Sequence, residues 1–295
     1  MATATDTESR HNLPTDDAAW TIVIKPKRKW LDVDLKALWR YRDLYVMYIK
    51  RDFITLYKQT VLGPLWFVIQ PLLTTFVYMF VFGGLAGIST DGIPQQLFYM
   101  SGAILWGYFS SSFNNCSNVF VANVGVFSKV YFPRLIVPLA NITSNLFKMG
   151  IQLAVFIVLY LHLVLHGADI GINWSLCLFP VLILMIALHA LSWGLIVSSL
   201  TYKYRDLIQI VAFGMQLFMY ATPVVYPLSA MPEKYKLLIE LNPLTPIFEA
   251  FRYGCMSCGS IDWGGLLYSA TFLVVMLFCA VVVFNRVERN FMDTV

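Results

Sequence analysis

The sequence contains few charged residues for its length: 13% of its 295 residues are Asp, Glu, Lys or Arg, whereas 58% are hydrophobic. A soluble globular domain carries about 25% charged residues, so this composition indicates an integral membrane protein. The five cysteines are odd in number and lie mostly in apolar stretches, which disfavours a disulfide framework. The N-terminal stretch is polar and contains Pro14, Asp16 and Asp17, so a cleavable signal peptide is not expected there.

Motifs of catalysis and nucleotide binding are also missing. No glycine is directly followed by lysine, so a phosphate-binding loop of the G-x-x-x-x-G-K-[ST] kind is absent. There is no H-E-x-x-H motif and no clustered set of metal ligands. A membrane enzyme such as a glycosyl-lipid transferase would need acidic or histidine residues gathered at one membrane face. This class is disfavoured, because the acidic residues of the expected outer segments are scattered, at Asp91, Asp169, Glu233, Glu240 and Asp262.

Long hydrophobic stretches predict an all-α membrane protein with six spanning helices. A helix needs about 20 apolar residues to cross a bilayer, and no charged residue occurs between Gly63 and Thr90. The predicted spans cover residues 64–86, 97–121, 139–165, 174–200, 207–228 and 264–285. The segment 229–262 is too polar and too rich in proline to be a simple span. It is predicted to form a re-entrant hairpin of two short helices on the outer side.

Three regions are expected along the chain. Residues 1–34 form a polar cytoplasmic tail that includes the basic cluster KPKRK. Residues 35–62 form an amphipathic helix at the membrane surface, because apolar residues recur there at steps of three and four between basic and aromatic ones. Residues 63–295 form the transmembrane domain.

Basic residues set the expected orientation, since cytoplasmic loops carry an excess of Lys and Arg. If the N-terminus is cytoplasmic, the basic residues of segments 129–134, 203–205 and 286–289 also lie inside. The expected outer loops, around Asp91 and over residues 166–169, contain no Lys or Arg. Apart from the hairpin, six spans with both termini inside therefore place every Lys and Arg of the loops and termini on the cytoplasmic side.

Five motifs of the chain resemble the membrane subunits of type-2 ABC exporters of bacterial surface polysaccharides, such as O-antigen, capsule or teichoic acid. The motifs occur in the family's order and on consistent membrane sides, and the resemblance covers roughly residues 35–295. They read RDFITLYKQTVLGPLWFVIQPLL, KVYFPRLIVPLA, YKYRDL, LNPLTPIFEAFR and ERNFMD.

The resemblance implies a permease in the bacterial inner membrane rather than an enzyme. Such subunits pair as homodimers on two copies of a separate ATP-binding subunit, which binds ATP and Mg²⁺, so no cofactor is expected in this chain. The cargo would be an undecaprenyl-linked glycan passed to the outer face, and no nucleic-acid partner is expected. The alternative within transport is an ABC-2 exporter of a small lipophilic compound or drug, whose members usually lack the long amphipathic entry helix.

The stretch KVYFPRLIVP joins the second and third predicted spans on the cytoplasmic side. Its two prolines fix the backbone, and aromatic residues with arginine are typical of interaction hot spots. A positive-inside loop with aromatics at headgroup level is the plainer alternative. With the resemblance, the expected docking residues for the ATP-binding subunit are Lys129, Tyr131, Phe132, Pro133 and Arg134, together with Arg51 and Asp52 of the amphipathic helix.

The second predicted span is unusually polar, because SSSFNNCSN lies at membrane depth. Small and amide residues of this kind serve helix packing, or they line a half-wet path for a sugar chain beside aromatic rings. Lys148 is either such a functional group at depth or a lysine that reaches the inner headgroups. The candidate path residues are Trp66, Tyr78, Trp106, Tyr108, Phe109, Asn114, Asn115 and Lys148.

The hairpin sequence LNPLTPIFEAFR interrupts its helices at two Asn/Thr-Pro steps. Irregular backbone at membrane depth is tolerated only against protein or water. The resemblance implies a gate on the outer side, and a passive outer cap is the alternative. The expected gate residues are Asn242, Pro243, Thr245, Pro246, Glu249 and Arg252.

Overall fold

The structure is a computed structural model that describes residues 35–58, 61–130, 132–168, 170–201, 203–204, 206–257 and 259–294. Within these ranges the chain is helical and contains no strand, which confirms the predicted all-α class. The predicted polar tail, residues 1–34, lies outside the described residues.

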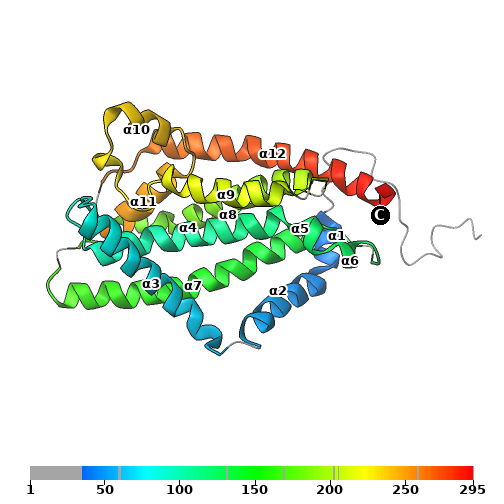
Figure 1. Cartoon of the computed structure of the whole chain (residues 1–295), viewed down its shortest axis with the longest axis horizontal. Helices are drawn as coiled ribbons and strands as arrows, with labels where there is room; N and C mark the ends of the chain where they lie inside the picture. The colour runs from blue at the N-terminus through cyan, green and yellow to red at the C-terminus, as the bar shows by residue number, and fades with distance from the viewer. Residues whose placement is uncertain are drawn as a thin grey trace, which may run out of the picture.

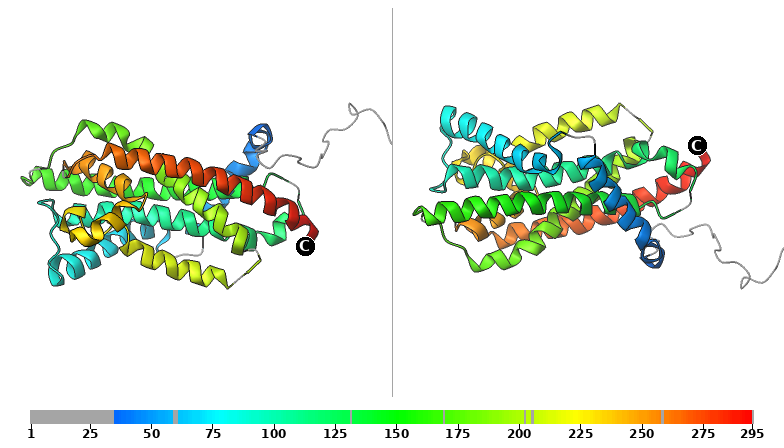
Figure 2. Two further views of the ribbon diagram at one scale, coloured as in Figure 1. Left: turned by 90° about the horizontal axis from the view of Figure 1, so that it is seen from above. Right: turned by 90° about the horizontal axis from the view of Figure 1, so that it is seen from below.

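The helices are joined by short 3₁₀ segments and one π-helical segment, η3. In chain order they are α1 (Leu35–Arg40), α2 (Arg42–Tyr57), η2 (Gly63–Leu65), α3 (Trp66–Tyr78), η3 (Met79–Leu85), α4 (Gln95–Ser117), α5 (Val119–Ala122), α6 (Val124–Phe127), α7 (Ile136–Leu165), η4 (Trp174–Leu178), α8 (Phe179–Thr201), α9 (Leu207–Tyr220), η5 (Leu228–Ala230), α10 (Glu233–Glu240), α11 (Thr245–Met256) and α12 (Trp263–Thr294). The long helices α4, α7, α8 and α12 run side by side in an elongated bundle (Figures 1 and 2). We call the end with α10 and α11 the α10 end, and the end with α1, α5 and α6 the α5 end.

Helices α4 and α8 form the centre of the bundle. Helix α8 packs against α4 on one side and α12 on the other, and α4 also packs against α7. The backbones of α4 and α8 approach so closely that a Cβ at Gly194 would overlap the side chain of Cys116. Most residues of α4 are therefore buried, including Phe98, Tyr99 and Phe109.

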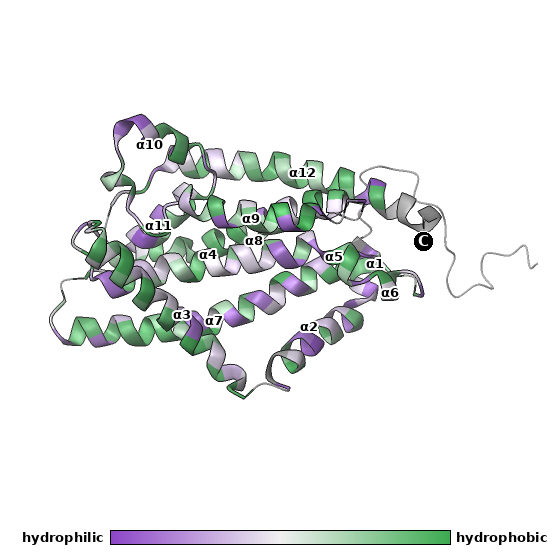
Figure 3. Cartoon of the chain, viewed as in Figure 1, coloured by the Kyte–Doolittle hydropathy of each residue, from purple (hydrophilic) through white to green (hydrophobic). Residues whose placement is uncertain are grey.

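Four helical segments are long and apolar enough to cross a membrane, and they match four of the predicted spans: Gly63–Leu85, Ile136–Leu165, Trp174–Thr201 and Trp263–Val287. Helices α3, α7 and α12 are largely hydrophobic, as Figure 3 shows, and many of their large apolar side chains are exposed, such as Phe76, Val158 and Val274. In the first segment, 11% of the most apolar window is buried inside the chain. Lipid or another subunit must therefore cover it.

The second and fifth predicted spans differ from the prediction. The helix expected over 97–121 ends at Ser117, because Asn118 and Asn123 interrupt it and start the short helices α5 and α6. The helix expected over 207–228 ends at Tyr220 and is a shorter apolar helix of 14 residues, about 21 Å long at 1.5 Å per residue. Neither α4 nor α9 is both long enough and apolar enough to count as a membrane-crossing helix by itself, so the six-span topology stays a prediction.

Helices α1 and α2 occupy the predicted N-terminal helical region and end at Tyr57 rather than at residue 62; the position of this region at the membrane surface stays a prediction. Helix α2 crosses the outside of α7 obliquely, as the right-hand view of Figure 2 shows. Its inner face contains the buried ring of Tyr48 and the partly buried Ile49, whereas Val46 is 43% exposed. The predicted helical periodicity is confirmed, and the apolar Val46 lies on the outer side of the helix.

Candidate functional site

The loop between α6 and α7 is anchored inside the chain by its aromatic and basic residues. Phe132 is buried, with its ring centroid 6.3 Å from that of Tyr48 in α2 and 5.7 Å from that of Phe127 in α6. Arg134 is also buried, and its guanidinium carbon lies 5.6 Å from the centroid of the Phe127 ring. These two side chains therefore tie the loop to its own α2 and α6.

The accessible part of this loop is smaller than the sequence indicated. Lys129 is exposed, Val130 is 56% exposed and Pro133 is partly buried, whereas Tyr131 lies outside the described residues. The docking role of the loop stays a prediction. Of the docking residues expected here and described, Lys129 offers the most accessible contact, and Phe132 and Arg134 offer little surface to a partner.

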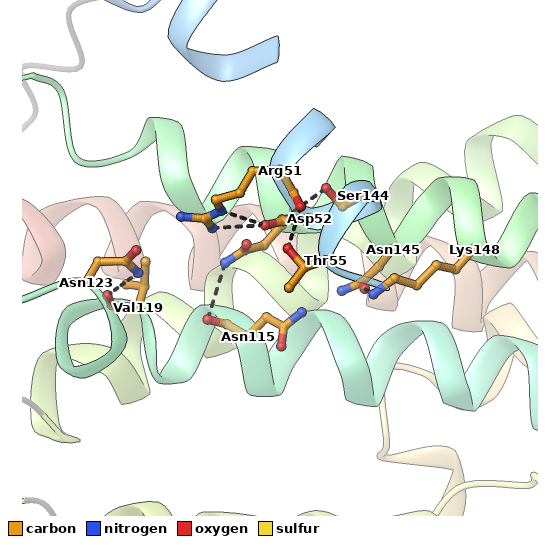
Figure 4. A network of polar contacts seen from close by, with 10 residues as sticks. Arg51, Asp52, Thr55, Asn115, Val119, Asn123, Ser144, Asn145 and Lys148 are labelled. Atoms are coloured by element: carbon orange, nitrogen blue, oxygen red, sulfur yellow. Dashed lines mark hydrogen bonds and ion pairs between the residues drawn. The ribbon is translucent and has the colours of Figure 1, made fainter. Parts of the chain in front are cut away.

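Helix α2 is joined to α7 by a seam of specific contacts. The Tyr45 hydroxyl and the Thr143 hydroxyl are 2.6 Å apart, and Ser144 donates to Oδ2 of Asp52 at 3.2 Å. Arg51 binds the other oxygen of Asp52 at 2.9 Å, as Figure 4 shows. Asp52, predicted as a docking residue, therefore turns toward α7, while Arg51 stays half-exposed.

The polar contacts continue from α7 into α4. Lys148 donates to Oδ1 of Asn145 at 2.9 Å, and Asn145 donates to the Ser112 hydroxyl of α4 at 3.3 Å. Asn115 of α4 is exposed, and its carbonyl accepts a 3.5 Å contact from Asn141 of α7. Ser112 and Asn115 of α4 thus both accept from asparagines of α7, and Asn145 links Lys148 to Ser112; Figure 4 shows Asn115, Asn145 and Lys148.

A half-open groove of about 460 Å³ lies between α4 and α9. Its lining combines hydroxyl and amide groups with aromatic rings: Trp106, Ser110 and Asn114 from α4, and Phe213, Gln216 and Tyr220 from α9. The structure brings Trp106 and Asn114, both predicted path residues, into this groove. The contributions of α9 were missed, although Gln209 and Gln216, seven residues apart in an apolar helix, were a usable signal.

The other predicted path residues lie elsewhere. Tyr108 and Phe109 are buried core residues, and the Phe109 ring packs against Trp193 of α8 at 5.8 Å. Trp66 is 46% exposed at the start of α3. The Tyr78 hydroxyl contacts the Met219 sulfur at 3.2 Å, so Tyr78 holds α3 against α9 beside the groove.

At the α10 end, a buried arginine connects three elements. Arg252 of α11 is 2% exposed and donates to the carbonyl of Val224 at 2.8 Å and to that of Tyr226 at 3.5 Å. Its guanidinium carbon lies 3.9 Å from the centroid of the Phe98 ring in α4. Nη1 of Arg252 lies 3.4 Å from Oε1 of Glu249. Burial raises the pKa of the Glu249 carboxyl and the charge of Arg252 lowers it, and burial is the larger effect.

The remaining predicted gate residues organise the turn between α10 and α11. The Asn242 amide donates to the carbonyl of Ala221 at 3.0 Å and to the Thr222 hydroxyl at 2.8 Å. Thr245 donates to the carbonyl of Ile239 at 2.6 Å. Pro243 and Pro246 are buried beside them. Two short helices, α10 and α11, are present as predicted, and Asn242 and Arg252 bind the turn that follows α9; the re-entrant course of this segment and its role as a gate stay predictions.

The sequence profile of the family described as ABC-2 type transporter matches residues 44–256 of this chain. The chain is 29% identical over 257 residues to the O-antigen export system permease protein RfbA of Klebsiella pneumoniae, covering 85% of this chain and 94% of that protein. It is 27% identical to a protein of the same name from Myxococcus xanthus, covering 88% and 98%. The polysialic acid transport protein KpsM of Escherichia coli is 26% identical, with coverage of 81% and 91%.

Proposed function

This chain belongs to the ABC-2 type transporter family, and from that premise we propose that it is the permease subunit of an exporter of lipid-linked bacterial surface polysaccharide. Its relatives of near-equal length are named for O-antigen export and polysialic acid transport, and no relative named for drug export is among them. The cargo class follows from these relatives, and the groove between α4 and α9 supplies a physical reason.

The groove is the single observation that carries the proposal. Asn114, Gln216 and Ser110 offer hydrogen-bonding groups in a region expected to lie in the bilayer, and Trp106 and Tyr220 offer aromatic faces. A polysaccharide needs both, because its hydroxyls require polar partners and its ring faces pack on aromatic surfaces. Polar groups facing lipid would be costly. We therefore propose that a second copy of the chain closes the groove into a path, which makes the permease a homodimer.

The energy for transport is proposed to come from a separate ATP-binding subunit, in two copies per dimer. The chain has no phosphate-binding loop, so ATP and Mg²⁺ would bind to that partner. We propose that its docking surface is formed by Lys129 and the exposed face of α2 that includes Arg51. This assignment places the α5 end in the cytoplasm.

The proposed topology has six crossings of the bacterial inner membrane, with both termini in the cytoplasm. Helix α4 contributes a crossing despite its polar residues, because these would face the path rather than lipid. Helix α9 crosses together with the turn that follows it, which Asn242 and Arg252 hold in place. The α10–α11 hairpin then forms the outer gate.

The test replaces Gln216 by Leu in the full chain, expressed with its ATP-binding subunit in a host that lacks its own exporter. Surface glycan, measured by antibody binding to whole cells, should fall severalfold, while the chain stays in the membrane. Gln152→Leu on α7 is the matched control, because Gln152 does not line the groove, and it should export normally. Wild-type cells that gain drug efflux but no surface glycan would refute the polysaccharide assignment in favour of a lipophilic cargo.

A further inference from the structure

The groove between α4 and α9 is lined without a single charged side chain. All ten residues that line it belong to the described part of the chain, and they are aromatic, apolar, amide or hydroxyl residues. The two helices that form it, Gln95–Ser117 and Leu207–Tyr220, contain no Asp, Glu, Lys, Arg or His at any position. A cargo in this groove would therefore meet only neutral side chains of this chain.

The segments next to these helices extend the uncharged region. In the sequence, no charged residue occurs over residues 92–128, which include α4, or over residues 207–232, which include α9. Helix α3 lies beside the groove, where the Tyr78 hydroxyl contacts the Met219 sulfur, and it belongs to the uncharged stretch 63–90. The lack of charge is thus a property of all three helices around the groove.

Lys148, a cation linked to α4 through hydrogen bonds, acts on the other side of that helix. Its ammonium group donates to Asn145, and Asn145 donates to Ser112. Ser112 is two residues away from both Ser110 and Asn114, which corresponds to about 200° around a helix of 3.6 residues per turn. Ser110 and Asn114 line the groove, whereas Ser112 is fully buried. Lys148 therefore lies outside the groove lining.

An uncharged lining discriminates between neutral and anionic sugars. The side chains of Ser110, Asn114 and Gln216 both donate and accept hydrogen bonds, and sugar hydroxyls do the same. A carboxylate or phosphate on a sugar loses hydration when it enters a region expected to lie in the bilayer, and its burial is costly unless a cation compensates it. Pores for anions are accordingly lined by Arg or Lys. The groove therefore favours sugars without charge.

We propose that the repeating unit of the exported glycan is uncharged, a polymer of neutral sugars without carboxylate or phosphate groups. The inference rests on the proposed function of the groove as part of the path. It holds for the path of a dimer as well, because a two-fold interface presents the same surface from both copies. An anionic linkage between the glycan and a lipid carrier would pass the groove once, whereas charged repeats would meet it along the whole polymer.

The test expresses the full chain with its ATP-binding subunit in a host that lacks its own exporter. The host makes one of two glycans on the same lipid carrier: a neutral hexose polymer, or a polymer of similar length with one uronic acid in each repeat. Surface glycan is measured by antibody binding to whole cells and divided by the total lipid-linked glycan. Wild type should export the neutral polymer at least about tenfold more efficiently, because no cation lines the groove for the uronate.

Charge substitutions in the groove provide the matched variants. Gln216→Lys adds a cation at an exposed position of α9 and should lower the preference for the neutral polymer severalfold, whereas Gln216→Glu should keep that preference. The readout is the ratio of the two polymers, so a general loss of export does not imitate the effect. If Gln216→Lys does not reach the membrane, Ser110→Lys on α4 takes its place, and the same shift is expected.

The outcomes separate this inference from the proposed function. Equal or preferential export of the uronate polymer by wild type, or an unchanged ratio in the lysine variants, would overturn the inference and leave the proposed function standing. If neither polymer reaches the surface although the chain is in the membrane, the proposed function is refuted, and the inference falls with it.

Discussion

Replacing Arg252 by methionine should destabilise the α10 end more than any other single change among the expected gate residues. Methionine keeps much of the side-chain volume but removes the donors to Val224 and Tyr226 and the pair with Glu249. A hydrogen bond to a charged group contributes about 1.5–3 kcal/mol, and removing one partner of a buried pair costs about 3–5 kcal/mol. These losses overlap, so we expect the free energy of unfolding to fall by about 3–5 kcal/mol.

The assay compares variants by reversible unfolding in mixed micelles and by hydrogen exchange of the turn over residues 221–227. Glu249→Gln is the control, because it removes the ion pair and leaves both carbonyl hydrogen bonds of Arg252 in place. Glu249 is about one-fifth exposed and glutamine keeps an oxygen acceptor there, so this variant should cost less stability than Arg252→Met. Faster exchange in the turn is expected for Arg252→Met alone. If the two variants unfold alike, Arg252 does not hold the turn through its carbonyl bonds.

Two further predictions use matched pairs of positions. Gly102→Ala should lower the thermal unfolding temperature, since its Cβ would overlap the carbonyl oxygen of Val224. Gly107→Ala on the same helix meets nothing within 4 Å and should be neutral or slightly stabilising. Equal effects of the two variants would contradict the close approach of Gly102 to Val224. Phe132→Ala should cost about 3–5 kcal/mol of stability, whereas Lys129→Glu should leave stability unchanged and reduce copurification of the ATP-binding subunit. Normal copurification in Lys129→Glu would refute docking at this loop.

The spans were predictable because the property that defines them is local. A run of apolar residues of sufficient length is visible in the sequence, and the first, third, fourth and sixth spans were placed to within a few residues. The ends of α4 and α9 were not, because they depend on single positions. Asn118 bonds its side chain to the carbonyl of Asn114, four residues earlier, and this local bond competes with helix continuation.

The candidate site was harder to predict, because composition does not say which side of a loop faces inward. Phe132 and Arg134 have the composition of a hot spot, and the same composition serves an internal anchor. The internal contact depends on the distant Tyr48, which comes beside Phe132 only in three dimensions. Likewise, the polar face of α4 was visible in the sequence, whereas its pairing with Gln216 depends on how α9 packs.

The anchoring of the loop also bears on how a signal from the proposed ATP-binding subunit would reach the membrane helices. Because Phe132 packs on Tyr48, the loop and α2 cannot be displaced independently without exposing two large rings to solvent. Helix α2 is in turn fixed to α7 through Asp52 and Ser144. A force applied to the loop therefore acts on the seam of α2 and α7 as well as on the ends of α6 and α7.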